Sequence, residues 1–264
     1  MNIPLLVALF AILIANVAQA GEEDVGGDAA EGKHRLDLTY LKVSTFDTNV
    51  RVNYLLFGYT RSFNSGIRTG VQTGLLLVSD SPSPDSVAME TTTERYLADT
   101  TLTFQYDFSE EIAASPWVPD TLGLNAQLTL PTGNADNALG IDAWFLSVGA
   151  GWGGNPIWDL WLVPAVGYEF TFAEGDSAIP VSNAYATLPV IWVAPSGLWI
   201  GYSLTLRRDI EANEWLDDHG LTVGKMFRNG FGLSLDFGDS DRVGPVSIPD
   251  DDQLVINFHY QFGN

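Results

Sequence analysis

Ionisable side chains recur on the polar side of a series of alternating segments. In each segment apolar residues occupy every second position, and the charges lie between them among Gly, Ser, Thr, Asn and Gln. Side chains of a strand switch faces at every residue, so these groups would share one surface of a sheet. If that sheet closes into a barrel, the surface lines a lumen. The predicted lumen residues are Arg51, Arg61, Arg68, Asp99, Asp107, Glu169, Arg207, Asp236 and His259.

Two interpretations of these charges remain open. Charges removed from water are stabilised by partners of opposite sign, so the set would form a salt-bridge network that holds the wall. Charges around a constriction would instead select ions. Arg61 and Arg68 flank the Asn64 turn, and Asp107 falls at the same end of a neighbouring segment. These three residues are therefore predicted to meet at one mouth of the lumen.

Catalysis is the first alternative, because some twelve-stranded barrels are lipases. Such an enzyme needs a serine, a histidine that activates it and a polar residue that orients the histidine. The chain has three histidines, His34, His219 and His259, and none has an obvious serine partner. Ser203 and Ser234 remain candidate partners in space. We expect no catalytic site.

Metal binding is the second alternative. Asp239–Asp241 and Asp250–Asp252 lie in a segment, 239–252, that is rich in aspartate and contains two prolines. Carboxylate oxygens suit calcium, but neither run has the spacing of an EF-hand loop. The chain has no cysteine, which removes thiolate ligands. We expect a solvated loop here and no metal or cofactor.

The positioning elements are strands, and the clearest is 121–130. Its even-numbered residues are four leucines and an alanine, and its odd-numbered residues are Thr, Gly, Asn, Gln and Thr. This length and alternation are typical of a transmembrane β-strand. Similar segments predict an all-β, antiparallel, up-and-down barrel of about twelve strands at 35–43, 49–63, 67–79, 96–108, 121–130, 143–153, 160–172, 183–194, 198–209, 219–227, 231–237 and 253–262.

The connections between these strands alternate in length. Turn signals such as Asn64–Gly66 and Asn229–Gly230 join strands at one end, whereas long acidic segments, among them 211–218 and 239–252, join them at the other. Aromatic residues gather near strand ends, as in the girdles of membrane barrels. The connection 109–120 is an exception, because it is long on the short side. Overall, the pattern favours a membrane barrel over a soluble sandwich.

The first 34 residues are predicted to lie outside the barrel. Residues 1–20 contain an apolar run that ends in Ala18-Gln19-Ala20, which is typical of a cleaved signal peptide. Residues 21–34 form an acidic, glycine-rich tail that we expect to be disordered, and residues 35–264 would form the barrel. The formal net charge of −21 disfavours binding to nucleic acid.

One stretch resembles a known family. Leu130-Pro131-Thr132-Gly133, then Leu139-Gly140-Ile141-Asp142, then a glycine-rich segment ending near Trp152, resemble the outer-membrane transporters associated with meta-pathway phenol degradation. The resemblance implies passage of small, aromatic or apolar molecules across the outer membrane. It covers about residues 123–168, and the rest of the chain fits only in its strand pattern.

The sequence thus predicts a passive channel or transporter in the bacterial outer membrane. Its expected partners are outer-membrane lipid and lipopolysaccharide, a small solute, and the assembly machinery that reads a terminal aromatic strand. Here Phe262 ends that strand and Gly263 and Asn264 follow it. A non-conducting structural or adhesive barrel with acidic surface loops is the main alternative, and a lipid hydrolase is the other.

Overall fold

The structure is a computed structural model that describes residues 33–45, 50–63, 66–80, 93–108, 121–133, 143–157, 160–172, 181–243 and 246–262. Within these ranges the regular secondary structure is β-strand, and no helix suited to crossing a membrane is found. The predicted signal peptide, most of the predicted tail and the Leu139–Asp142 stretch lie outside the described residues.

Alternation of apolar and polar residues produces fourteen strands. The strands are β1 (Lys33–Thr45), β2 (Val50–Ser62), β3 (Ile67–Asp80), β4 (Thr93–Leu97), β5 (Thr100–Asp107), β6 (Thr121–Leu130), β7 (Trp144–Ile157), β8 (Leu160–Leu162), β9 (Ala165–Phe172), β10 (Ser182–Val193), β11 (Leu198–Asp209), β12 (Trp215–Met226), β13 (Phe231–Val243) and β14 (Val246–Phe262).

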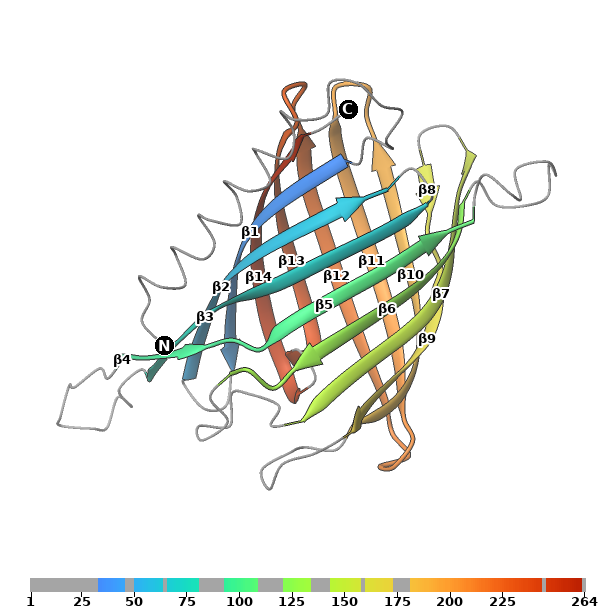
Figure 1. Cartoon of the computed structure of the whole chain (residues 1–264). Helices are drawn as coiled ribbons and strands as arrows, with labels where there is room; N and C mark the ends of the chain where they lie inside the picture. Colours follow the sequence, from blue (N-terminus) through green and yellow to red (C-terminus); the bar gives the residue numbers. More distant parts are fainter. Residues whose placement is uncertain are drawn as a thin grey trace.

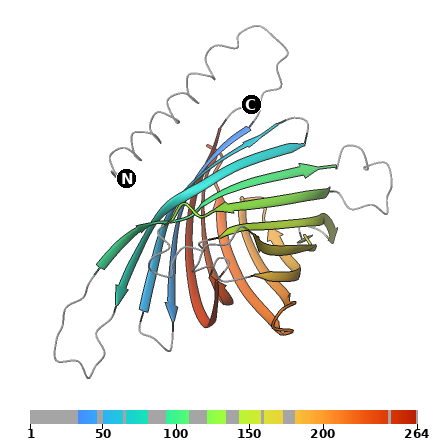
Figure 2. The ribbon, with the colours of Figure 1, turned by 60° about the horizontal axis from the view of Figure 1, so that its bottom comes forward.

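These strands form one antiparallel sheet that closes on itself. β4 and β5 are two halves of one wall strand, as are β8 and β9, so the wall has twelve strands. Each wall strand pairs with the next along the chain, and β1 pairs with β14 to close the ring, which brings the blue and red strands side by side (Figure 1, Figure 2). The predicted twelve-stranded up-and-down barrel is confirmed.

Two wall strands are interrupted, each for a local reason. Between β4 and β5, residues 98–100 lie opposite only residues 73–74, which is a β-bulge. Between β8 and β9 the pairing with β10 keeps its register, but Pro164 and the neighbouring Pro189 have no N–H to donate to the ladder. The sequence predicted each of these interrupted strands as a single element.

Three glycines close hairpins at one end of the barrel, which we call the turn end. Gly66, Gly197 and Gly230 have φ angles of 77°, 81° and 80°, in the left-handed region that favours glycine. The chain also ends on this side, after β14. The turn predicted at Asn229–Gly230 therefore falls where expected, as does Gly66 of the turn predicted at Asn64–Gly66. The opposite end is called the loop end.

The two faces of the wall differ as the alternation predicts. On β6, Leu124 is exposed on the outer face, and Asn125 and Gln127 line the interior. Large apolar side chains cover the outside of the isolated barrel, among them Phe104, Trp144, Val148, Trp152, Val166, Leu188, Trp192, Ile200, Tyr202, Leu221, Phe237, Phe258 and Tyr260.

Three predicted boundaries were wrong. Lys33 and His34 begin β1 rather than ending the tail. Half of the acidic segment 211–218 is strand, because β12 begins at Trp215 and pairs with β11. Likewise, the predicted loop 239–252 is largely strand, because β13 and β14 continue as a hairpin past a register shift between Ser240 and Arg242. In both hairpins backbone pairing overrides the low strand propensity of Asp and Pro.

Candidate functional site

The interior of the barrel contains two cavities that meet. One has a volume of about 660 Å³ and the other, the second cavity, about 570 Å³. Arg35, Asp37, Thr60 and Thr103 line both, so the cavities adjoin at these side chains. Most other lining residues are Ser, Thr, Asn, Gln or charged. The candidate site is therefore the lumen itself.

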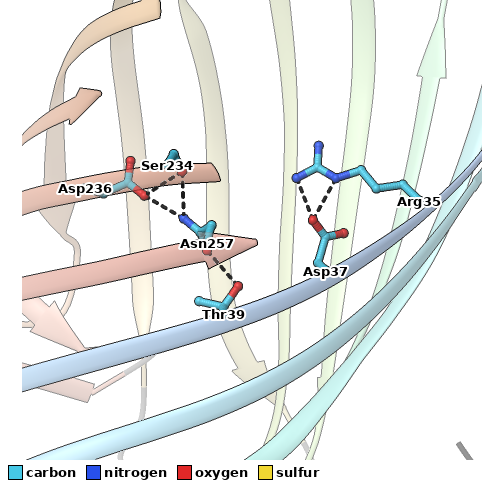
Figure 3. A network of polar contacts seen from close by, with 6 residues as sticks. All are labelled: Arg35, Asp37, Thr39, Ser234, Asp236 and Asn257. Atoms are coloured by element: carbon cyan, nitrogen blue, oxygen red, sulfur yellow. Dashed lines mark hydrogen bonds and ion pairs between the residues drawn. The ribbon is translucent and has the colours of Figure 1, made fainter. Parts of the chain in front are cut away.

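An ion pair stands where the cavities meet. Arg35 Nε and Nη2 each lie 2.7 Å from Asp37 Oδ1, and the two residues are neighbours on the inner face of β1 (Figure 3). The Arg35 side chain is 50% exposed to the lumen and Asp37 only 17%. Gly58 on β2 leaves room for the Asp37 side chain, because a Cβ at position 58 would lie 3.2 Å from Asp37 Cβ. Asp37, on the same strand, thus fixes the position of the Arg35 guanidinium in the lumen.

A hydrogen-bond network joins three strands beside this pair. Thr39 Oγ1 donates to Asn257 Oδ1 at 2.7 Å, linking β1 to β14. Asn257 Nδ2 donates to Asp236 Oδ2 at 2.6 Å and to Ser234 Oγ at 3.3 Å, linking β14 to β13 (Figure 3). The network crosses the seam where the first and last strands meet and leaves its polar groups on the second cavity.

A second charge cluster lies on the opposite wall. Arg207 Nε on β11 is 3.6 Å from Glu169 Oε2 on β9, and the Arg207 guanidinium also pairs with Asp218 on β12. All three side chains are less than a fifth exposed. One cation therefore holds two carboxylates from separate strands, and two members of this cluster, Arg207 and Glu169, are among the predicted lumen residues.

Aromatic rings on the inner face lie against glycines of neighbouring strands. A Cβ at Gly167 or Gly149 would meet the Tyr185 ring, and one at Gly224 would meet the Trp199 indole. These glycines leave room for the rings close to the wall. The Tyr185 hydroxyl occupies the space that a side chain at position 149 would need.

Six of the nine predicted lumen residues have the predicted inward position. Arg68 donates to Ser62 and Gln105, neighbours on the inner wall near the turn end. Register gives Asp107 the same face, since it continues the inner series of Thr103 and Gln105. The inner face also carries Glu169, Arg207, Asp236 and His259.

Arg61 was assigned to the wrong face. Its register partner is His34, on the outer face of β1, and its guanidinium lies 4.7 Å from the centre of the Phe63 ring. Segment 54–59 is apolar at odd and even positions, so alternation alone could not orient β2. Arg51 belongs to the same odd-numbered series, but its side chain lies outside the described ones. Arg61 therefore does not join Arg68 and Asp107 at the predicted mouth.

Asp99 has a structural contact that also explains the Leu-Pro-Thr-Gly motif. Its Oδ1 accepts the Gly133 N–H at 2.7 Å, and Thr132 Oγ1 accepts the Thr100 N–H at 2.9 Å. A Cβ at Gly133 would lie 2.9 Å from the Leu97 carbonyl oxygen, so only glycine fits closely. The motif that carries the resemblance thus fastens the end of β6 to the bulge between β4 and β5.

Replacing Asp99 tests this contact. Asp99→Ala removes a charge-assisted hydrogen bond, and we expect the free energy of unfolding to fall by about 1–2 kcal/mol. The measurement is the urea midpoint of the barrel in lipid vesicles. Glu211→Ala, in an exposed turn, is the control and should leave the midpoint unchanged. Equal midpoints for the two variants would contradict the assignment.

Sequence reasoning missed several lumen charges. Arg35 and Asp37 were not assigned to a face, although Leu36, Leu38 and Tyr40 alternate with them and would have indicated one. Asp218 was assigned to a loop because the start of β12 was placed four residues too late. Lys33, which also lines the larger cavity, was assigned to the tail.

The described geometry gives His219 no serine partner and shows no metal cluster. His219 Nδ1 lies 2.6 Å from the Tyr202 hydroxyl and its Nε2 lies 2.8 Å from Asp217 Oδ2, so both ring nitrogens have partners other than serine. Ser203 lines the interior face, opposite to His219. No group of three His, Asp or Glu side chains is placed to hold a metal within the described ranges.

Comparison with known proteins shows the fold. No family model and no curated protein matches the chain. Among solved structures, it is similar to the COG4313 outer membrane channel from Pseudomonas putida F1, with a TM-score of 0.61 and 15% identity over 91% of this chain and 98% of that one. It is also similar to the NanC porin, with a TM-score of 0.54 and 9% identity over 85% of this chain and 98% of that one. For the KdgM porin the TM-score is 0.51 and the identity 12%, over 86% of this chain and 99% of that one.

Proposed function

We propose that the protein is a passive channel for small solutes in the bacterial outer membrane. The observation that carries the proposal is the pair of adjoining, polar-lined cavities inside a closed wall whose outside is apolar. A closed barrel satisfies its backbone hydrogen bonds within the wall, as a bilayer requires. The similarity to solved outer membrane channels supports the same fold.

The sequence supports the proposed location. A cleaved signal peptide would export the chain, the turn end would face the periplasm, and the acidic loop end would face outward towards lipopolysaccharide. The aromatic terminal strand would be recognised during assembly. The resemblance to phenol-pathway transporters, and the aromatic or apolar solutes that it implies, stay predictions.

The charge on the lumen wall favours cations. Arg35 is paired with Asp37, and Arg207 holds two carboxylates. Asp236 faces the second cavity and Asp107 lies near the turn end, and Lys33 and Arg68 balance these two charges. The second carboxylate of the Arg207 cluster therefore leaves one net negative charge among these residues. Salt screens such charges over about 10 Å at 0.1 M, so selectivity should be largest at low ionic strength.

Conductance in planar bilayers tests the proposal. We expect discrete channels whose reversal potential in a salt gradient shows that cations permeate faster than chloride. Asp37→Asn with Asp236→Asn should move the permeability ratio towards one, because both carboxylates face the second cavity. Asp217→Asn is the control, since this carboxylate lies on the outer face and is 56% exposed.

The alternative is a non-conducting structural or adhesive barrel. Its lumen would be closed to ions, and purified protein would produce no channels although it inserts into the bilayer. That result would exclude the proposed channel. Calcium-dependent release of fatty acids from phospholipid by the same preparation would instead favour a lipid hydrolase.

A further inference from the structure

We propose that the second cavity is a binding site for neutral, polyhydroxylated ring solutes such as monosaccharides. The inference rests on the proposed channel function and adds the class of solute. The cavity volume of about 570 Å³ lies within the range of small-molecule sites, about 300–1,000 Å³. Two kinds of surface meet in it, an indole ring and a cluster of hydrogen-bonding groups.

Trp199 supplies the aromatic surface. It lines the second cavity from β11, and its position over Gly224 of β12 presses one side of the indole against the wall. The other side is left for the lumen, because the Trp199 side chain is only half-buried. A flat aromatic surface binds the apolar C–H face of a sugar ring while the hydroxyl groups around that ring remain free to bind polar partners.

Hydrogen-bonding groups line the same cavity. Asp236, Asn257 and Ser234 form one connected group, and Arg35 and Asp37 form another, so their positions are fixed before a solute arrives. Together they offer carboxylate and amide oxygens as acceptors and guanidinium N–H groups as donors. A hydroxyl group both donates and accepts, so a polyol can match this mixture.

Two other classes of solute fit less well. An apolar or aromatic hydrocarbon would take the polar groups of Asp236 and Asn257 out of water without replacing their hydrogen bonds, which is unfavourable. An anionic solute would meet Asp37 and Asp236, while Arg35 is already paired with Asp37. A neutral polyol avoids both costs.

The test is interruption of single-channel current by D-glucose, phenol and D-glucuronate. We expect glucose to interrupt the current of the wild type saturably, and more strongly than the other two. Trp199→Ala should raise the half-saturating glucose concentration about fivefold, the amount that one aromatic contact contributes. Trp199→Phe keeps an aromatic face and should fall between. Trp192→Ala, which removes an outward tryptophan from the neighbouring strand, is the control.

The outcomes separate the two proposals. A wild type that inserts but carries no current overturns the channel, and this inference with it. A conducting wild type that glucose does not interrupt, or that phenol interrupts more strongly, overturns the inference and leaves the channel. Trp199→Ala that matches Trp192→Ala overturns it as well. Glucose interruption that Trp199→Ala weakens and Trp199→Phe partly restores supports it.

Discussion

Leu124→Arg is expected to lower the free energy of unfolding in a bilayer by about 2–4 kcal/mol, whereas Asn125→Arg changes it little. The two residues are adjacent on β6, but Leu124 lies exposed on the outer wall and Asn125 lines the larger cavity. An arginine at 124 would be placed in hydrocarbon, and one at 125 would enter a polar lumen. The two variants therefore test membrane insertion by placing the same arginine at adjacent positions on opposite faces of the wall.

The measurement is reversible urea unfolding in phospholipid vesicles, followed by tryptophan fluorescence. The same two variants in detergent micelles provide a check, because water reaches a side chain more easily there and the difference should shrink. Equal effects at 124 and 125 in vesicles would contradict a lipid-facing outer wall. A larger loss at 125 would reverse the assignment of the two faces.

Arg207→Met should destabilise the barrel by about 2–4 kcal/mol, because it leaves Glu169 and Asp218 facing each other without the cation between them. Methionine keeps much of the side-chain volume, so the loss is one of charge. Adding Glu169→Gln and Asp218→Asn to the variant should restore much of the stability, since no unpaired charge remains.

Arg68→Met is the matched control for that experiment. Arg68 also points into the lumen, but its side chain is exposed and donates to the neutral groups of Ser62 and Gln105. Arg68→Met should lower the free energy of unfolding by about 1 kcal/mol or less. If Arg207→Met costs no more than Arg68→Met, the charge cluster does not hold the wall. If the triple variant is no more stable than Arg207→Met, the loss of stability does not come from the unpaired carboxylates of Glu169 and Asp218.

Alternation predicts a face only where one set of residues is clearly polar. It orients 121–130 correctly because four leucines oppose Asn125 and Gln127. It misplaces Arg61 because 54–59 is apolar on both parities, and there the neighbouring strands decide. The bulge at 98–100 shifts the register of its wall strand by one residue, which a count along the sequence cannot reveal.

The contacts of the candidate site were less predictable than its faces. Arg207 meets Glu169 and Asp218 only because three strands have particular registers, and register is a property of the assembled sheet. Likewise, Thr39 reaches Asn257 because β1 pairs with β14. Trp199 lies on the inner face of β11, but the role of Gly224 beneath it depends on which strand lies beside β11.

The seam between β1 and β14 has a consequence for the timing of folding. Every other neighbouring pair of wall strands in the described barrel is consecutive along the chain, so each such pair can form as soon as both of its strands are made. The seam instead joins Thr39 to Asn257, which are 218 positions apart, and it must wait until the last strand has been made. Contacts between distant parts of a chain form slowly. Until then both strands expose unpaired edges, and the strong negative charge of the chain would keep separate molecules apart during that delay.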